Sequence, residues 1–422
     1  MKKKLLVLGG KPIGSVEMVL RAQALGYYVI VTDYLNVNES PAKKYADESW
    51  QVSTADVNKI AELCREKEVS GVLTAVHEFN INRMRELCNL LNFPCYCESD
   101  AWKYCDDKVE FKKMCLASGL LVAKEYHSGV YTKNISEKID SYPVVVKPVD
   151  GSGSRGFSIC KSAGELAIGI DNAKKNSPTQ RFLVEDFVPY ESVIIHYTII
   201  NGIAFFCGMS DKKSVKFSNT NAPVMGIQHF PSMGSEVYLK SYDKLVGQML
   251  QEANFQQGPV WIEAFYDGKE RFIFNEMGFR FGGSLTYYPV KYFYGIDQLD
   301  LLIDSSFNRI STIPVCGNLL SERKNYCILP VHIRPGRINK IIGVDDIKKL
   351  DDLIAYVPVH FEGELIEAWG SAQQVFCYLH FTYDSVESQK LIIRKILSTL
   401  QAQNAYGENL LYTLFDIETL VC

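Results

Sequence analysis

The sequence predicts a multi-domain protein of mixed α/β and α+β class, and three observations support this. At roughly 150 residues per domain, a length of 422 residues favours about three domains. Short apolar runs alternate with helical patterns over the first hundred residues, as in a doubly wound parallel sheet. The middle of the chain is rich in strand patterns, and the last hundred residues mix both. We therefore expect three domains, over residues 1–104, 105–312 and 313–422.

The first domain shows the alternation most clearly. Its predicted elements are a buried strand at 4–9, a helix at 15–25, a strand at 28–32, a helix at 56–67, a strand at 71–76 and a helix at 79–91. Gly9, Gly10 and Gly14 follow the first strand, but their spacing departs from the dinucleotide-binding G-x-G-x-x-G, and Pro12 would stiffen the loop. A tight turn between strand and helix explains this segment better than a nicotinamide site.

The later segments change in pattern. They predict helices at 108–118, about 240–253, 345–350 and 385–400, and strands at 144–147, 181–186, 192–200, 203–209, 259–266, 271–277, 326–333 and 375–381. The strands at 259–266 and 271–277 form a predicted hairpin that turns at Asp267-Gly268. The segments after about 313 look like a small α+β unit.

The overall composition is that of a globular protein. Hydrophobic residues make up 47% and charged residues 22%, and 45 basic against 49 acidic side chains leave a net charge of −4. This balance argues against a chain built to neutralise nucleic-acid phosphates. The apolar run Leu5–Leu8 is too short for a signal peptide, and no stretch approaches the ~18 to 20 apolar residues of a membrane span. We expect a soluble, cytoplasmic protein without a nucleic-acid or membrane partner.

The cysteines and histidines give little support to a zinc site. Twelve cysteines include no Cys-x-x-Cys pair, and Cys95 and Cys97 are the closest in sequence. Seven histidines show no His-x-x-x-His spacing. Free thiols in a reducing compartment are the better interpretation.

The densest run of glycine and serine follows a lysine at a strand end. In the segment 147–156, Lys147 ends the predicted strand, and the flexible loop after it could close over phosphate oxygens with its backbone N–H groups. The segment is not a P-loop, because its lysine precedes the glycines. A surface turn beside a solvated lysine explains this segment equally well.

Glu263 and Glu276 lie on the two strands of the predicted hairpin. With a two- or four-residue loop, opposed residues have numbers that sum to an odd value, so both glutamates share one face. Neighbouring carboxylates repel unless a cation lies between them, and carboxylates completed by phosphate and water suit Mg²⁺. The alternative is two exposed glutamates, but Trp261, Phe265 and Phe274 on the same face argue against a solvated surface. A three-residue loop would separate the glutamates and exclude the site.

Arg280 follows the second glutamate by four residues and precedes Phe281 and two glycines. A guanidinium there can clamp a carboxylate or an acyl phosphate through two hydrogen bonds. A structural salt bridge is the alternative, and Arg280 alone does not decide between the two.

Taken in order, these segments resemble the ATP-grasp superfamily. The matching segments are Asp107-Lys108, 142–148, the loop 150–156, 183–187, Glu263 and 276–283. The chain is similar in layout to the carboxylate–amine ligase branch, which includes biotin carboxylase, D-alanine–D-alanine ligase and dipeptide-forming amino-acid ligases. No single motif is specific, whereas six in the right order are. The resemblance covers the whole chain and implies an ATP-grasp fold: a Rossmann-like N-terminal domain, a two-lobed grasp with a mobile lid near 150–200, and a small C-terminal domain.

The resemblance also implies roles for individual residues. Lys108 and Lys147 would hold the α and β phosphates of ATP, and Lys147 and Arg280 would act in catalysis, with Arg280 on the substrate carboxylate or the transferred phosphoryl group. The remaining roles are the lid (Ser152, Gly153 and Ser154), the adenine-binding hinge (Glu185, Asp186 and Val188), the ribose hydroxyls (Glu191) and magnesium (Glu263 and Glu276), with Mn²⁺ as an alternative metal. The stretch from the hinge to Glu191 is shorter than is usual in the family.

One position departs from the family pattern. The residue two after the second metal glutamate is usually an asparagine that binds magnesium, and here it is Gly278. Asn275 precedes Glu276, but strand alternation predicts that it points to the other face. This departure puts the second metal in question.

The implied activity is an ATP-dependent ligation. A small-molecule carboxylate would attack the γ-phosphate to give an acyl phosphate and ADP, and an amine would then displace phosphate. The alternatives are an enzyme that phosphorylates carbamate or bicarbonate and an ATP-binding module without turnover. His196 and His229 could accept a proton from the amine, although structural roles suit them better. Many members of the family are dimers, so a homodimer fits the resemblance.

Overall fold

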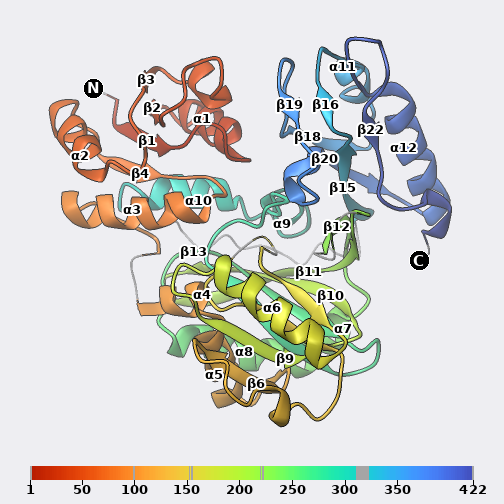
Figure 1. The fold of residues 1–422 in the computed structure, drawn as a ribbon. Helices are drawn as coiled ribbons and strands as arrows, with labels where there is room; N and C mark the ends of the chain where they lie inside the picture. The colour runs from red at the N-terminus through yellow and green to blue at the C-terminus, as the bar shows by residue number, and fades with distance from the viewer. Residues whose placement is uncertain are drawn as a thin grey trace.

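The computed structural model describes residues 2–97, 100–151, 153, 155–218, 220, 223–309 and 323–420. In Figure 1 the N-terminal elements (red to orange) and the C-terminal elements (blue) both lie above the central strands. The mixed α/β and α+β class is confirmed. Two of the predicted site residues, Ser152 and Ser154, and the expected boundary near 312 fall outside the described residues.

The N-terminal elements form a four-stranded parallel sheet with the strand order β3-β2-β1-β4. Its strands β1, β2 and β4 are almost entirely buried apolar runs, which is typical of a parallel sheet covered by helices, whereas the edge strand β3 is half-buried. The elements are β1 (Lys4–Leu8), α1 (Ser15–Ala24), β2 (Tyr28–Thr32), β3 (Glu48–Trp50), α2 (Val57–Glu66), β4 (Gly71–Leu73) and α3 (Glu78–Leu91). The predicted alternation of strands and helices is confirmed here.

The turn after β1 closes through Asp33, which follows β2. Its carboxylate accepts hydrogen bonds from the Gly10 N–H and the Ser40 hydroxyl, each at 2.7 Å, and pairs with Lys43 at 2.8 Å. In dinucleotide-binding folds the acidic residue near this position is free to bind a ribose. Asp33 is instead occupied by the turn, so the structure supports a tight turn here.

A ten-stranded sheet forms the centre of the molecule, with the strand order β18-β20-β15-β12-β11-β10-β13-β14-β5 and β22 paired to β15. Its strands are β5 (Leu121–Val122), β10 (Glu191–Ile200), β11 (Ile203–Val215), β12 (Val224–Phe230), β13 (Gly258–Tyr266), β14 (Phe272–Gly278), β15 (Asn325–Ile333), β18 (Leu353–Pro358), β20 (Val375–Tyr383) and β22 (Leu411–Tyr412). The C-terminal strands therefore continue the central sheet through the β12–β15 pairing.

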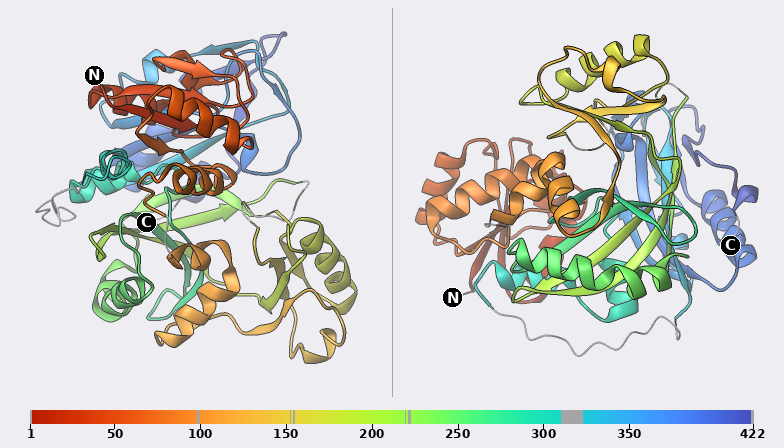
Figure 2. Two further views of the ribbon diagram at one scale, coloured as in Figure 1. Left: turned by 90° about the vertical axis from the view of Figure 1, so that its left-hand side faces the viewer. Right: turned by 90° about the horizontal axis from the view of Figure 1, so that it is seen from below.

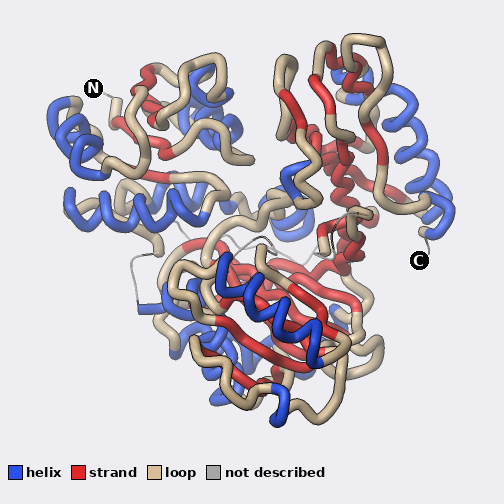
Figure 3. Tube along the Cα trace, viewed as in Figure 1, coloured by secondary structure: helices blue, strands red, loops and turns tan. Residues whose placement is uncertain are grey.

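A smaller four-stranded sheet, with the order β6-β9-β7-β8, projects from the rest of the molecule in Figure 2 (right). Its elements are β6 (Glu125–Gly129), β7 (Val144–Pro148), β8 (Ser158–Cys160), α6 (Ala163–Lys175) and β9 (Phe182–Asp186). Helix α6 covers one face of this sheet (Figure 3). We call these five elements the small lobe. Strand β9 leads into β10 through residues 187–190, and β5 leads into β6 through residues 123–124, so two short segments join the small lobe to the central sheet.

The remaining helices pack on the central sheet or on the C-terminal strands. They are α4 (Lys103–Asp106), α5 (Lys108–Ala117), α7 (Ser235–Ser241), α8 (Asp243–Glu252), α9 (Tyr287–Tyr294), α10 (Gln298–Ser305), α11 (Val344–Ile347) and α12 (Val386–Thr399). Two further strand pairs are β16 (Gly336–Arg337) with β19 (Leu365–Ile366), and β17 (Lys340–Ile342) with β21 (Gln401–Gln403). In the part of the chain that the structure describes, no helix combines the length and apolarity needed to cross a membrane.

Buried aromatic side chains join the N-terminal elements to the hairpin of β13 and β14. Tyr96 packs edge-on against Phe279, with ring centroids 5.5 Å apart, and both rings lie close to Gly258 at the start of β13. This contact fixes the end of β14, and with it Arg280, against the N-terminal elements.

Candidate active site

The hairpin of β13 and β14 brings the two predicted metal ligands together. Glu263 lies directly opposite Glu276 in the register, so the prediction that they share a face is confirmed. The loop of the hairpin differs from the expected two- or four-residue loop. The Asp267 N–H donates to the Arg271 carbonyl at 3.1 Å, which leaves a three-residue loop, and opposed residues near the turn sum to an even number. Such a loop alone would separate the glutamates.

A β-bulge at Asn275 restores the pairing. Ala264 faces Phe274 while Glu263 faces Glu276, so Asn275 is the extra residue on its strand. Its side chain donates from Nδ2 to Glu263 Oε2 at 2.9 Å. The prediction that Asn275 points to the other face is therefore wrong, because an inserted residue interrupts the period of two on which it rested.

Glu263 is buried and has three hydrogen-bond partners. Its Oε1 accepts from the Ser192 hydroxyl at 2.6 Å and from Lys212 Nζ at 2.5 Å, while its Oε2 accepts from Asn275. Burial alone would raise the pKa of this carboxyl, but attraction to Lys212 and these hydrogen bonds outweigh burial and lower the pKa to about 2. Glu263 is therefore ionised at neutral pH.

Glu276 connects to the start of α5. Its Oε2 lies 3.4 Å from Lys108 Nζ, which also donates to the Gly151 carbonyl at 2.6 Å. Asp107 caps α5 by accepting from the N–H groups of Val109 and Glu110 at 2.8 and 3.2 Å. The cap fixes the helix start, so Lys108 lies between the second glutamate and the glycine–serine loop.

Lys147 lies near the end of β7 in the small lobe and points toward the hairpin. Its Nζ lies 2.6 Å from Glu185 Oε1 and donates to Asn275 Oδ1 at 2.8 Å. Glu185 is only 3% exposed and also pairs with Lys112. Burial would raise the pKa of Glu185, but the two lysines outweigh burial and lower it. The Glu185 side chain therefore holds a lysine, which leaves the predicted adenine contacts to backbone groups.

The other hinge residues lie where the small lobe meets the central sheet. Asp186 accepts a hydrogen bond from the Tyr126 hydroxyl at 2.6 Å, Val188 lies in the connecting segment, and Glu191 is exposed at the start of β10. Gly153 lies in the loop after β7 with φ of 65°. Their contacts with ATP remain predictions.

Arg280 bridges the hairpin and the N-terminal elements. Its guanidinium lies over the Trp261 ring, 5.3 Å from the centroid, and donates to the Phe281 carbonyl at 2.9 Å and to Glu78 Oε2 at 3.3 Å. A Cβ atom on Gly278 would come within 2.5 Å of the Trp261 ring. Trp261 therefore fills the space that an asparagine at 278 would need.

The donor set fits a magnesium site completed by phosphate. Glu263 and Glu276 supply two facing carboxylates, the number that Mg²⁺ takes from a protein when phosphates and water supply the rest. Among the described residues, no group of three His, Cys, Asp or Glu side chains is placed to hold a metal ion. The described residues therefore do not form a metal site from protein ligands alone.

His196 and His229 are both buried. Burial lowers the pKa of His196 to about 3 and that of His229 to about 4, so both rings are neutral at pH 7. His196 stacks on Phe230, with centroids 5.5 Å apart, and His229 Nε2 lies 2.7 Å from Gln389 Nε2.

Four side chains of this centre were not predicted to contribute: Lys112, Ser192, Lys212 and Glu78. Lys212 gives the clearest sequence signal, because the charged run Asp211-Lys212-Lys213 interrupts an apolar strand. Ser192 has no comparable signal, since its contact depends on the pairing of β10 with β13.

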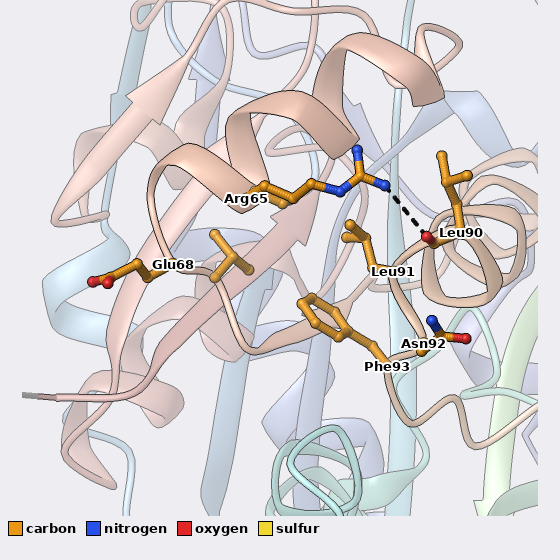
Figure 4. Close-up of a pocket in the computed structure, with 8 residues that line it drawn as sticks. Arg65, Glu68, Leu90, Leu91, Asn92 and Phe93 are labelled. Carbon is orange, nitrogen blue, oxygen red and sulfur yellow. Dashed lines mark hydrogen bonds between the residues drawn. The ribbon is translucent and has the colours of Figure 1, made fainter.

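A separate pocket of about 310 Å³ lies where α2 and α3 end (Figure 4). Arg65 spans it by donating to the Leu90 carbonyl at 3.4 Å, and Glu68, Leu91, Asn92 and Phe93 are among the other lining residues. None of the predicted site residues lines this pocket, so it is distinct from the candidate active site.

Sequence comparison finds partial relatives. No protein-family model matches the chain. The formate-dependent phosphoribosylglycinamide formyltransferase of Bacillus subtilis is 27% identical over 209 residues, which are 48% of this chain and 53% of that enzyme. The chain thus spans about half the length of the curated relatives it matches.

Structural comparison finds matches along nearly the whole chain. The L-amino acid ligase from Bacillus licheniformis superposes with a TM-score of 0.72 at 18% identity, over 94% of this chain and 98% of that chain. The biotin carboxylase domain of the Hydrogenobacter thermophilus 2-oxoglutarate carboxylase superposes with a TM-score of 0.78 at 17% identity, over 95% of this chain and 90% of that chain. The fold of this chain is therefore the ATP-grasp fold, as the order of its motifs predicts.

Proposed function

We propose that the chain is an ATP-dependent ligase that joins a small carboxylic acid to an amine through an acyl phosphate and releases ADP and phosphate. The observation that carries this proposal is the facing pair Glu263 and Glu276. Lys212 pairs with Glu263, Lys108 pairs with Glu276, and Lys147 reaches the pair through Asn275. The names of two relatives, an L-amino acid ligase and a formate-dependent formyltransferase, support a carboxylic acid as substrate.

ATP and Mg²⁺ are the proposed cofactors. Glu263 and Glu276 would hold the metal, which when bound neutralises charge on the transferring phosphoryl group. Lys108 and Lys147 would hold the α and β phosphates, since both ammonium groups already lie beside these glutamates or their neighbour Asn275. The ion pair with Glu185 would keep Lys147 pointed toward the phosphates.

The remaining residues would orient the acid and exclude water. Arg280 is fixed from two sides, by the Trp261 ring and by Glu78, and its guanidinium can pair with a carboxylate. The small lobe would close over ATP about the segment 187–190 and protect the acyl phosphate from hydrolysis. The amine then displaces phosphate, so no side-chain nucleophile is required.

An isotope experiment tests the proposed reaction directly. The purified chain is incubated with MgATP, a panel of ¹⁸O-labelled carboxylic acids and a panel of amines, and ADP, phosphate and amide are followed by mass spectrometry. Passage through an acyl phosphate transfers one ¹⁸O atom from the acid to the released phosphate. Turnover that needs bicarbonate alone would indicate the carbamate or bicarbonate alternative, and ATP binding without release of ADP would indicate a binding module.

Variants connect that reaction to the site. Glu276→Gln should spare ATP binding and abolish turnover, whereas Lys147→Ala should weaken ATP binding. Lys113→Ala removes an exposed lysine of α5 and controls for the loss of one positive charge. Unchanged turnover in Glu276→Gln would overturn the metal assignment.

A further inference from the structure

The β-bulge places the Asn275 carboxamide between a cation of the small lobe and a carboxylate of the central sheet. Lys147 Nζ donates to its Oδ1 at 2.8 Å, and its Nδ2 donates to Glu263 Oε2 at 2.9 Å. A lysine ammonium can only donate and an ionised carboxylate can only accept. The chemistry of the two partners therefore fixes the orientation of the amide.

Asn275 is also the middle member of a longer series of contacts. The series runs Lys112, Glu185, Lys147, Asn275, Glu263 and Lys212. Lys112 belongs to α5, Glu185 and Lys147 belong to the small lobe, and Glu263 and Lys212 belong to the central sheet. Cations and anions alternate along the series, and Asn275 is the neutral member that joins the contacts of Lys147 to those of Glu263. Aspartate could not replace it, because its second oxygen would repel Glu263, and an apolar side chain would satisfy neither neighbour.

We propose that Asn275 is a positioning residue that couples the nucleotide lysine to the metal carboxylate, a role that rests on the proposed function. It holds Lys147 toward the phosphates and Glu263 toward the metal at once. In this chain the position of the usual family asparagine is Gly278, and Trp261 covers it. Asn275 therefore supplies a carboxamide beside the glutamate pair, and the β-bulge directs its side chain there.

The proposal predicts that Asn275 acts on ATP through Lys147. Loss of the hydrogen bond to a charged group should weaken ATP binding about tenfold. Calorimetry in EDTA measures ATP binding without metal, and titration with Mg²⁺ at fixed ATP measures the metal requirement. Asn275→Leu should raise both the dissociation constant for ATP in EDTA and the Mg²⁺ concentration at half-saturation.

A double-mutant cycle separates positioning from general damage. In the Lys147→Ala background, Asn275→Leu should change the dissociation constant for ATP in EDTA by less than about twofold, because its partner is gone. Ile273→Val alters a half-buried side chain on the same strand and controls for packing. If the leucine variant does not fold, Asn275→Ala replaces it in the same double-mutant cycle.

The outcomes are distinguishable. If Asn275→Leu changes the dissociation constant for ATP in EDTA equally in the unaltered chain and in the Lys147→Ala variant, or changes it in neither, the role of Asn275 is overturned. The ligase proposal would stand in that case. Absence of ATP binding by the unaltered chain, with and without Mg²⁺, would overturn both. The inference is supported if Asn275→Leu weakens ATP binding in the unaltered chain but not in the Lys147→Ala variant, while Ile273→Val leaves ATP binding unchanged.

Discussion

The indole ring of Trp261 lies against the backbone of Gly278 on the neighbouring strand, so closely that a Cβ atom at 278 would be 2.5 Å from it. The same ring supports the Arg280 guanidinium. One aromatic side chain thus links an unusual glycine to the arginine of the candidate active site.

Gly278→Asn should destabilise the chain by about 1–3 kcal/mol, because overpacking forces the half-buried Trp261 ring to move. Urea unfolding measures this loss. The double variant Trp261→Ala/Gly278→Asn should be more stable than the sum of the two single changes predicts, since removing the indole makes room for the amide. Additive losses would show that the two positions are independent.

Arg280→Lys should lower kcat about 10²-fold, the usual effect of removing one aligned donor, while leaving the dissociation constant for ATP within twofold. Lysine keeps the charge but cannot stack flat on Trp261 while also donating to Glu78. Steady-state kinetics and calorimetry separate the two effects. A loss of ATP affinity without a change in kcat would place Arg280 in nucleotide binding instead.

Glu185→Gln should be strongly destabilising at neutral pH, by about 3–5 kcal/mol, because it leaves Lys112 and Lys147 buried without their carboxylate. The pKa of Glu185 is lowered by folding from its ordinary value of 4.5, so the stability it adds is present above pH 4.5 and is lost as the pH falls below that value. The difference in free energy of unfolding between the two chains should therefore shrink below pH 4.5.

Chemical denaturation at several pH values checks this dependence on Glu185. Glu137→Gln removes an exposed carboxylate from the connection between β6 and β7 and is the matched control. A stability difference that stays constant from pH 7 to pH 3 would contradict the pairing with the two lysines.

Among the cysteines that the structure describes, Cys95 should react first with iodoacetamide. All ten cysteines in the described part of the chain are free. Hydrogen bonds from Cys88 and Cys97 lower the pKa of the half-buried Cys95 thiol, whereas burial raises the pKa of Cys64 and Cys115 to about 12. Its alkylation rate should rise less steeply between pH 6 and 8 than that of an ordinary thiol, which rises about tenfold per unit.

Peptide mass spectrometry after brief labelling identifies the cysteine that reacts first. Cys95→Ser should remove the early label. Early labelling that persists in this variant would assign the reactive thiol elsewhere.

Local patterns predicted much of the fold and the residues of the hairpin. Gly-rich turns, helix spacing and alternating strands identify elements whose periods can be counted along the chain. They also identified Glu263 and Glu276 as neighbours, although the geometry that makes them so was not predicted. A three-residue loop and a bulge at Asn275 each shift the alternation by one residue, and the two shifts cancel.

Contacts between distant strands could not be predicted in this way. Lys212 and Ser192 reach Glu263 because β11 pairs with β10 and β10 with β13, and no local signal specifies those partners. The same holds for the contact of Glu78 with Arg280, which depends on how the N-terminal elements pack on the hairpin.

The pairing of β12 with β15 has a practical consequence for dissecting this protein. A shortened chain that stopped before β15 would leave β12 with an unpaired edge of backbone N–H and C=O groups, including those of Gln228, His229 and Phe230. Bare edges of this kind recruit other chains, so such a fragment is expected to aggregate rather than to report the behaviour of an isolated nucleotide-binding unit. Fragment studies should cut after α3, because the N-terminal strands form a sheet of their own.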